Sequence, residues 1–330
     1  MNQLLNQSLR NEIDARWNSR TKPLGSLGRL EELARDFCLV RGEVLPACER
    51  LGVYVFAGDH GITEEGVSLY PKAVTAQMVA NFRAGGAAVN VLARSHGMSL
   101  EIIDAGVGEG TKNFARFEAM TVDECNAQIE AGREAARGAE GRFDLVGLGE
   151  MGIGNTTSAA AMLAAIEGLS GREVAGRGAG LDDAGVAHKA QVIEASLALH
   201  GLDGLQDASA VRVLQCVGGF EIARMAGFVM EASRLRLPVM LDGFITTVAA
   251  LAAVRMQPST REALFFSHRS AERAHGLALE ALDGDPLLEL GMRLGEGSGA
   301  ILGMQLMRTA MSLYREMASF ESAEVSGSGQ

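Results

Sequence analysis

The chain has 330 residues, of which 47% are hydrophobic and 22% charged, and a formal net charge of -11. This composition is typical of a globular enzyme, and no apolar run reaches the roughly 18 to 20 residues that a bilayer span requires. The acidic balance and the scattered lysines and arginines argue against nucleic acid as a partner. We expect a cytoplasmic protein, because the first residues lack the basic and apolar segments of a secretory signal.

Short β-prone runs alternate with longer helical patterns along the chain. The short runs are mostly continuous apolar segments, which is typical of strands covered on both faces, and the helix-length connections favour parallel pairing. We therefore predict an α/β fold with a doubly wound, mostly parallel, Rossmann-like sheet. The expected strands are residues 51–57, 100–104, 143–148, 211–217, 238–241 and 264–266. The expected helices are residues 27–41, 71–82, 87–96, 123–137, 155–166, 183–200, 220–234, 245–255, 270–282 and 299–317.

We expect one large α/β domain, residues 46–295, which carries the active site. N-terminal helices in residues 1–45 and a C-terminal helix in residues 296–321 are expected to pack together as a small helical subdomain. In the C-terminal helix Met304, Met307, Met311 and Tyr314 share one face at helical spacing, which indicates core packing. Residues 322–330 are polar and rich in Gly and Ser, so we predict a disordered tail.

Polar residues follow most of the predicted strands, at the edge where an open parallel sheet binds its ligands. The junction after the third strand is the most specific, because three glycines precede Asn155, Thr156 and a run of small residues. Asn and Thr are good N-caps, and a helix N-terminus favours phosphate, so this junction is interpreted as a monophosphate cradle. It lacks the G-K-[ST] ending of a P-loop, and an ordinary tight turn before a capped helix remains the alternative. Lys189 is a candidate for an additional positive charge at the phosphate.

Two other junctions resemble catalytic or metal sites and lack the necessary partners. Asp59 and His60 follow the first strand, but no second His or carboxylate stands at ligand spacing, and the four cysteines form no C-x-x-C pair. We therefore predict no metal. Ser267 precedes His268 without a G-x-S-x-G elbow, so the expected role of Ser267 is to donate to phosphate rather than to act as a nucleophile.

Two glutamates next to glycines, Glu150 and Glu296, are the best acid/base candidates. Glu296 lies in the stretch Leu294-Gly295-Glu296-Gly297 directly before an apolar helical run. Glycines on both sides remove Cβ bulk, so a flat ligand can approach the backbone while the carboxylate points at it. A pair of carboxylates at one site lets one stay ionised while the other holds a substrate donor.

Five segments in the same order resemble the family of nicotinate-nucleotide:dimethylbenzimidazole phosphoribosyltransferases. They are residues 22–31 (KPLGSLGRLE), 58–61 (GDHG), 149–157 (GEMGIGNTT), 241–244 (LDGF) and 294–300 (LGEGSGA). The resemblance covers nearly the whole chain. It implies that a benzimidazole nitrogen displaces nicotinate from C1′ of nicotinate mononucleotide with inversion, giving an α-riboside phosphate for the nucleotide loop of cobalamin.

The resemblance also implies roles for individual residues. Glu296 matches the family's proposed general base. The nucleotide phosphate and ribose are expected at Glu150, Gly152, Asn155, Thr156, Lys189 and Ser267. The aromatic base is expected near Asp59, His60, Tyr70, Gln77, Met78 and Leu294. No cofactor is implied, and family members are homodimers.

The identity of the accepted base stays open at the sequence level. Some family members carry Ser before the Pro-Lys pair where this chain has Tyr70, followed by Gln77 and Met78 in the next helix. Tyr70 and Met78 are suited to stacking on a flat ring. The alternatives are transfer to adenine, another benzimidazole or a phenol, and a non-catalytic protein that binds the α-riboside. Whether Glu150 acts in the chemistry or in binding is also open.

Overall fold

The computed structural model describes residues 2–203 and 209–326. Its centre is a five-stranded sheet in the order β2-β1-β3-β4-β5, and all four pairings are parallel. The strands are β1 (Leu51–Ala57), β2 (Ser99–Asp104), β3 (Leu145–Met151), β4 (Val239–Leu241) and β5 (Leu264–Phe266). This arrangement confirms the predicted doubly wound parallel sheet. In the order 2-1-3-4-5 the direction of winding reverses between β1 and β3, so a ligand crevice is expected there.

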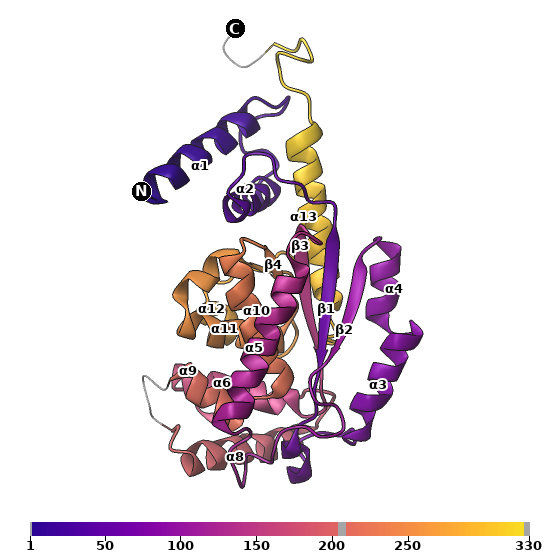
Figure 1. Ribbon diagram of the computed structural model, residues 1–330, viewed down its shortest axis with the longest axis vertical. Helices are drawn as coiled ribbons and strands as arrows, with labels where there is room; N and C mark the ends of the chain where they lie inside the picture. Colours follow the sequence, from indigo (N-terminus) through magenta and orange to yellow (C-terminus); the bar gives the residue numbers. More distant parts are fainter. Residues whose placement is uncertain (1, 204–208, 327–330) are drawn as a thin grey trace.

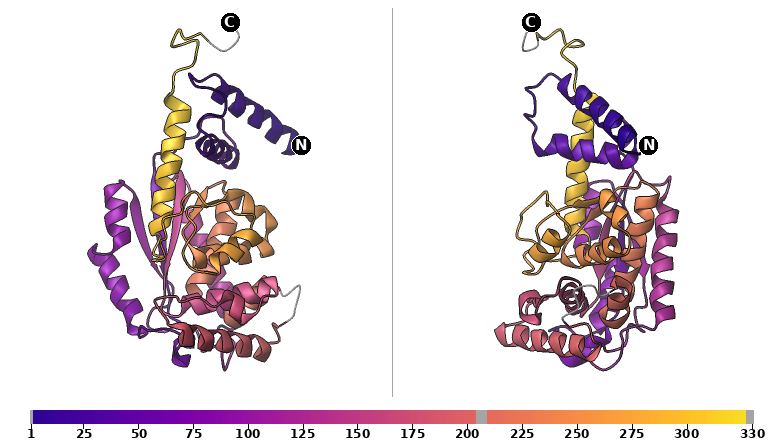
Figure 2. Two further views of the ribbon diagram at one scale, coloured as in Figure 1. Left: turned by 180° about the vertical axis from the view of Figure 1, so that it is seen from behind. Right: turned by 90° about the vertical axis from the view of Figure 1, so that its left-hand side faces the viewer.

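Helices cover both faces of the sheet (Figures 1 and 2). One face carries α3 (Ala73–Ala84), α4 (Ala88–Ser95) and α13 (Ser298–Glu316). The other carries α5 (Val122–Ala139), α6 (Asn155–Glu167), α10 (Phe220–Arg234) and α11 (Phe244–Met256). The remaining helices are α1 (Asn2–Asn18), α2 (Arg29–Arg41), α7 (Gly171–Val174), α8 (Asp183–Leu199), α9 (Ala210–Val217) and α12 (His275–Ala281), with 3-10 turns η1 (Gly61–Glu65) and η2 (Pro258–Ala263).

Alternate residues of each strand enter two separate apolar cores. Tyr54 and Phe56 of β1 pack with the helices of the α5 and α10 face, whereas Val53 and Val55 pack with α2, α4 and α13. Because successive side chains of a strand point to opposite faces, continuous apolar runs are required when both faces are covered. This explains why the short runs in the sequence do not alternate with polar residues.

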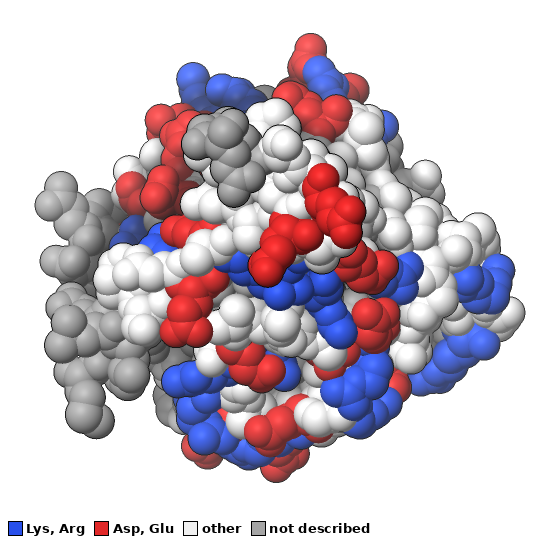
Figure 3. Space-filling model, turned by 90° about the horizontal axis from the view of Figure 1, so that it is seen from above, with Lys and Arg blue, Asp and Glu red and all other residues white. Residues whose placement is uncertain are grey.

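Helices α1 and α2 pack with the C-terminal half of α13 at one end of the molecule (Figure 1). The predicted methionine face is confirmed as core, since Met304, Met307, Met311 and Tyr314 are all buried. Their cluster continues without a break from Trp17 in α1 to the strands β1 and β3, so the division into a large domain and a small subdomain stays a prediction. Acidic and basic side chains are interspersed over this end of the molecule (Figure 3).

The structure corrects the element predicted at residues 211–217. This segment is helix α9, which packs against α6 and α11 and does not join the sheet. An apolar run of seven residues cannot be assigned to a buried strand or a buried helix from periodicity alone.

The helix expected at residues 270–282 begins only at His275. The residues before it form a turn, because the Ser270 N–H donates to His275 Nδ1 at 2.9 Å and the Ala271 N–H donates to the Met292 carbonyl at 2.9 Å.

Within the predicted disordered tail, residues 322–326 are described. Ser322 closes a hydrogen-bonded turn with Ser319 there, while residues 327–330 lie outside the described part of the chain. Among the described residues, no helix is long and apolar enough to cross a membrane.

Candidate active site

The carboxyl ends of β1, β3, β4 and β5 lie at the end of the molecule remote from α1 and α2 (Figure 1). Gly58 follows β1 and Gly152 follows β3, and the two chains approach so closely that a Cβ on Gly152 would lie 2.5 Å from the Gly58 carbonyl oxygen. This contact is at the crevice between β1 and β3 where the winding of the sheet reverses. The sheet therefore gathers the predicted site residues at one edge.

Glu150 is buried near the end of β3, and its side chain accepts a hydrogen bond from the amide of Asn155 in the first turn of α6. Burial, followed by the nearby charge of Asp242, raises the pKa of Glu150 to about 8. Glu221 and Glu296 act in the same direction, whereas the Asn155 hydrogen bond lowers it. Glu150 is thus mostly protonated at neutral pH in the free protein.

Glu296 is held in a left-handed turn directly before α13. Gly295, Glu296 and Gly297 have φ values of 79°, 63° and 85°, a region that residues with a Cβ rarely adopt. The turn packs against β3 where Gly149 has no side chain, because a Cβ there would overlap the peptide that joins Glu296 to Gly297. Burial, followed by the charge of Asp242, raises the pKa of Glu296 to about 7. Its carboxylate is therefore close to half ionised at neutral pH.

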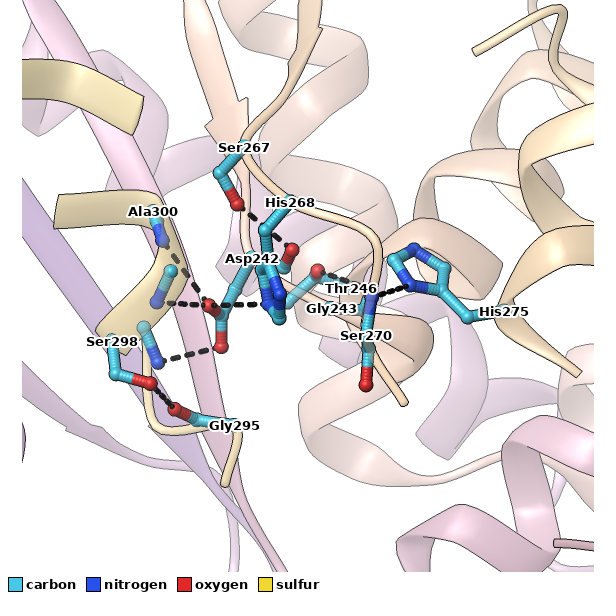
Figure 4. A network of polar contacts seen from close by, with 12 residues as sticks. Asp242, Gly243, Thr246, Ser267, His268, Ser270, His275, Gly295, Ser298 and Ala300 are labelled. Atoms are coloured by element: carbon cyan, nitrogen blue, oxygen red, sulfur yellow. Dashed lines mark hydrogen bonds and ion pairs between the residues drawn. The ribbon is translucent and has the colours of Figure 1, made fainter. Parts of the chain in front are cut away.

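Asp242, directly after β4, is a site residue to which the sequence analysis assigned no role (Figure 4). Its Oδ2 accepts the Gly297 N–H at 2.9 Å, and its Oδ1 accepts the N–H groups of Gly299 at 2.7 Å and Ala300 at 3.1 Å. A single buried carboxylate thus binds the turn that carries Glu296. In the sequence, Asp242 could have been identified as a site residue from its position immediately after a predicted strand and before a glycine.

Lys189 and Thr156 lie together at the N-terminal end of α6. Lys189 in α8 is 1% exposed, and its ammonium donates to the Thr156 hydroxyl at 2.9 Å. Burial lowers the pKa of Lys189 to about 8, which the charge of Glu272 partly opposes. A buried ammonium next to a helix N-terminus is a favourable place for a phosphate, because both groups attract negative charge.

In the turn of residues 152–154, which was interpreted as a phosphate cradle, one backbone amide is bound within the protein. The Ile153 N–H donates to the hydroxyl of the buried Thr75 in α3 at 3.1 Å, so it is already used within the protein. Amides in the first turn of α6 are also paired, since Asn155 donates to the Gly152 carbonyl at 3.1 Å and Thr157 to the Gly154 carbonyl at 2.9 Å. Phosphate binding at this junction and at Lys189 stays a prediction.

In this structure the Ser267 hydroxyl is used within the protein, and its expected contact with phosphate stays a prediction. Its hydroxyl is fully buried and donates to the Asp242 carbonyl oxygen at 2.9 Å, which leaves no proton for a phosphate in this conformation. The residue instead ties the end of β5 to the end of β4.

Asp59 and His60, which were expected near the base, are buried and hydrogen-bonded within the protein, and their contact with a base stays a prediction. His60 is fully buried, with Nδ1 3.0 Å from the Ser158 hydroxyl and Nε2 2.6 Å from Glu221 Oε1. Asp59 is 2% exposed and accepts the Gly108 N–H at 2.7 Å. His60 thus connects the segment after β1 to α6 and α10, and Asp59 connects it to the loop after β2. Glu221 was not among the predicted site residues, because its contact with His60 joins elements that are distant in the chain.

The remaining residues expected at the base lie nearer the surface. Tyr70 is 51% exposed in the segment before α3, and Leu294 is 55% exposed before the Glu296 turn. In α3, Gln77 is exposed and Met78 is partly buried against the core. Tyr70 and Leu294 thus have apolar surface free for a flat ligand, while the contact of Gln77 and Met78 with a base stays a prediction.

No group of three or more His, Cys, Asp or Glu side chains within the described ranges could hold a metal ion. The four cysteines are buried free thiols.

Comparisons with known proteins agree with this geometry. A family model described as phosphoribosyltransferase matches residues 3–325. The nicotinate-nucleotide–dimethylbenzimidazole phosphoribosyltransferase of Shewanella amazonensis is 50% identical over 331 residues, covering 95% of each chain. The enzyme of the same name from Pseudomonas putida is 47% identical over 339 residues, covering 98% of this chain and 96% of the relative.

A crystal structure of CobT from Thermus thermophilus superposes with a TM-score of 0.91 at 42% identity, covering 97% of this chain and 99% of that one. The fold, the two buried glutamates and the full-length similarity lead to one assignment: the chain belongs to the nicotinate-nucleotide–dimethylbenzimidazole phosphoribosyltransferase family.

Proposed function

We propose that this enzyme transfers the 5-phosphoribosyl group of nicotinate mononucleotide to 5,6-dimethylbenzimidazole. The products are nicotinate and α-ribazole 5′-phosphate, which serves the assembly of the nucleotide loop of cobalamin. The observation that carries the proposal is the pair of buried glutamates, Glu150 and Glu296, beside a buried lysine at a helix N-terminus. A carboxylate base and an anion site are the two elements that this transfer requires.

The phosphate of the nucleotide binds at the first turn of α6. Lys189 supplies a positive charge, and the Thr156 hydroxyl, which already accepts from Lys189 at 2.9 Å, has its own proton to donate. The helix N-terminus adds the partial positive charge of its amides. A bound phosphate favours the charged form of Lys189 and so opposes the effect of burial on the pKa of this residue.

Glu296 accepts the proton of the entering base. One benzimidazole nitrogen forms a bond to C1′, while the bond from C1′ to the pyridinium nitrogen breaks and its electron pair leaves with nicotinate. The proton on the other benzimidazole nitrogen becomes acidic as the first bond forms, and it passes to the Glu296 carboxylate. With a pKa of about 7, Glu296 is ionised often enough at neutral pH to accept this proton.

The two glutamates have different protonation states, which gives them different roles. Because the pKa of Glu150 is about 8 and that of Glu296 about 7, Glu296 loses its proton first as the pH rises. Glu150 then serves as a neutral hydrogen-bonding group toward the ribose.

The test is turnover of nicotinate mononucleotide and 5,6-dimethylbenzimidazole by the purified protein, with α-ribazole 5′-phosphate measured by chromatography. E296Q keeps the size of the side chain and removes the base, so we expect kcat to fall about 10²- to 10⁴-fold, the usual contribution of a general base. E289Q, on the exposed part of the same connecting segment, is the matched control and should retain wild-type kcat. Full turnover by E296Q would contradict the assignment of the base.

The acceptor is tested by competition between 5,6-dimethylbenzimidazole, adenine, another benzimidazole and a phenol. The apolar surface of Leu294 and the ring of Tyr70 favour a flat apolar acceptor. We expect the highest kcat/KM with 5,6-dimethylbenzimidazole. Turnover of another base without turnover of 5,6-dimethylbenzimidazole would contradict the proposed substrate.

We further propose that the enzyme is a cytoplasmic homodimer. Leu24, before α2, is 71% exposed, and Val91 on α4 is 52% exposed, so both offer apolar surface to a second copy. Sedimentation at several protein concentrations should give about twice the chain mass of 34.7 kDa. A constant mass of one chain would contradict the dimer, and recovery of the protein in a membrane fraction would contradict the compartment.

A further inference from the structure

The N-terminus of α13 is capped by Asp242, a carboxylate from a different element of the fold. The first amides of a helix have no partner within the helix, and the N-cap residue here, Gly297, has no side chain that could supply one. Asp242 accepts the Gly297, Gly299 and Ala300 N–H groups at 2.9, 2.7 and 3.1 Å. Figure 4 shows the carboxylate facing these amides from the end of β4. The side chain therefore binds the last residue of the turn together with the first turn of the helix.

The turn held in this way is the strained segment that presents Glu296. Residues 295–297 all have positive φ, and Glu296 is the only one of the three with a Cβ. The hydroxyl of Ser298, the first residue of α13, closes the turn by donating to the Gly295 carbonyl at 2.7 Å. From outside, Asp242 binds the amide immediately after Glu296. Without the Asp242 carboxylate, the left-handed conformation at Glu296 loses its strongest external hydrogen bonds.

Charged groups from several elements surround this turn. Asp242 itself faces His268, whose Nε2 lies 3.7 Å from Oδ1, at the end of β5. Glu150 from β3 and Glu296 both have a raised pKa to which Asp242 contributes, and Glu221 from α10 acts on Glu150. Burial raises the pKa of Asp242, while His268 and the three amides lower it. Asp242 thus affects this turn in two ways: its hydrogen bonds hold the backbone, and its charge raises the pKa of Glu296.

We propose that Asp242 is a positioning residue that holds the Glu296 carboxylate in the orientation needed to take a proton from the entering base. It acts through the backbone amides of Gly297, Gly299 and Ala300 and does not itself touch the substrate. This inference rests on the proposed role of Glu296 as the base.

Two variants separate the geometry of Asp242 from its charge. D242N keeps the shape, removes the charge and turns an NH₂ group toward at least one of the amides. We expect kcat to fall about 10²-fold, the cost of a small misplacement of a catalytic group, with little change in KM for nicotinate mononucleotide. The acid limb of its pH profile should move to lower pH, because the remaining Glu296 no longer faces a negative neighbour. D242E keeps the charge, so its acid limb should stay in place while kcat falls.

The matched control is D144N at the opposite end of the sheet. Asp144 is 1% exposed, compared with 2% for Asp242, and it accepts two backbone amides, those of Glu49 at 3.0 Å and Arg50 at 2.9 Å. D144N should lower the melting temperature and leave both kcat and the acid limb unchanged. A purely structural role for Asp242 predicts the same behaviour for D242N and D144N.

The outcomes distinguish this inference from the proposed function. Wild-type kcat in D242N or D242E, when E296Q has lost activity, overturns the positioning role and leaves the base assignment intact. Full activity in E296Q overturns the base assignment and the positioning role together. If D242N does not fold, D242E still decides, because a wild-type kcat in D242E contradicts the inference.

Discussion

At the scale of single residues, Glu296 combines three unfavourable properties that the surrounding structure compensates. It is buried, it adopts a left-handed conformation, and it lies near the negative charge of Asp242. A left-handed residue with a Cβ costs about 1–2 kcal/mol. Hydrogen bonds to a charged group contribute about 1.5–3 kcal/mol each, so the three amide bonds of Asp242 can offset this strain. The site therefore keeps a base of raised proton affinity in a defined position.

The pH dependence of the reaction should report Glu296. Its pKa is raised to about 7, and the base must be ionised, so kcat/KM for the acceptor should fall by about tenfold per pH unit below pH 7 and level off above it. Initial rates between pH 5.5 and 9 measure this limb. A rate that is constant from pH 5.5 to 8 would contradict the role of Glu296.

Above about pH 8 the rate should fall again, because Glu150, with a pKa of about 8, loses its proton and Lys189 loses its positive charge. Burial lowers the pKa of Lys189 to about 8, so its positive charge is lost above that pH unless a phosphate is bound. We expect K189M to raise KM for nicotinate mononucleotide about 10- to 100-fold, since a hydrogen bond to a charged group contributes about 1.5–3 kcal/mol. K112M, at an exposed lysine, is the control. An unchanged KM in K189M would exclude this lysine from the phosphate site.

At the scale of elements, glycines decide which helices and strands can approach one another. Gly132 of α5 packs against the backbone of Arg224 in α10, where a Cβ would overlap the carbonyl group. Gly227 of α10 packs in the same way against Ile129 of α5. Reciprocal glycines let two helices approach with their backbones in contact, which fixes α10, and with it Glu221, against α5.

The two glycines of α5 should respond differently to alanine. In G132A the new methyl group has no space, so the free energy of unfolding should fall by about 1–3 kcal/mol. In G138A, near the end of the same helix, a Cβ meets nothing within 4 Å, so the free energy of unfolding should rise by about 0.5–1 kcal/mol. Urea unfolding of both variants makes the comparison. Equal stabilities would show that the close contact of α5 with α10 contributes little.

At the scale of the whole molecule, α13 connects the active site with the helical end of the protein. Its 19 residues span about 28 Å, from the Glu296 turn at the strand ends to Tyr314, which packs on Trp17 of α1 with ring centroids 5.0 Å apart. Arg16 fixes the far end of the helix by donating to the carbonyl oxygens of Tyr314 at 3.3 Å and Arg315 at 2.9 Å. The chain's own α1 and α2 are thus held away from its active site.

Loss of the Trp17 side chain should destabilise the molecule without changing its chemistry. Trp17 is 1% exposed, and W17A should lower the free energy of unfolding by about 3–5 kcal/mol. Because Glu296 is positioned by Asp242 at the other end of α13, kcat measured well below the melting temperature should stay within about twofold of wild type. W17F should recover part of the stability. A parallel fall of kcat and stability would show that α13 transmits strain to the site.

The sequence by itself determined the fold class, the parallel strands, the methionine core and the family, because these depend on local patterns and on ordered motifs. The strand at residues 211–217 and the helix start at residue 270 were wrong, since short apolar runs and side-chain hydrogen bonds to loops have no unique local signature. Only the tertiary structure decided that His60 and Ser267 are buried supports and that Asp242 holds Glu296. The physical reason is that burial and hydrogen-bond partners come from elements distant in the chain: Asp242 and Gly297 meet only after β4 and α13 have packed together.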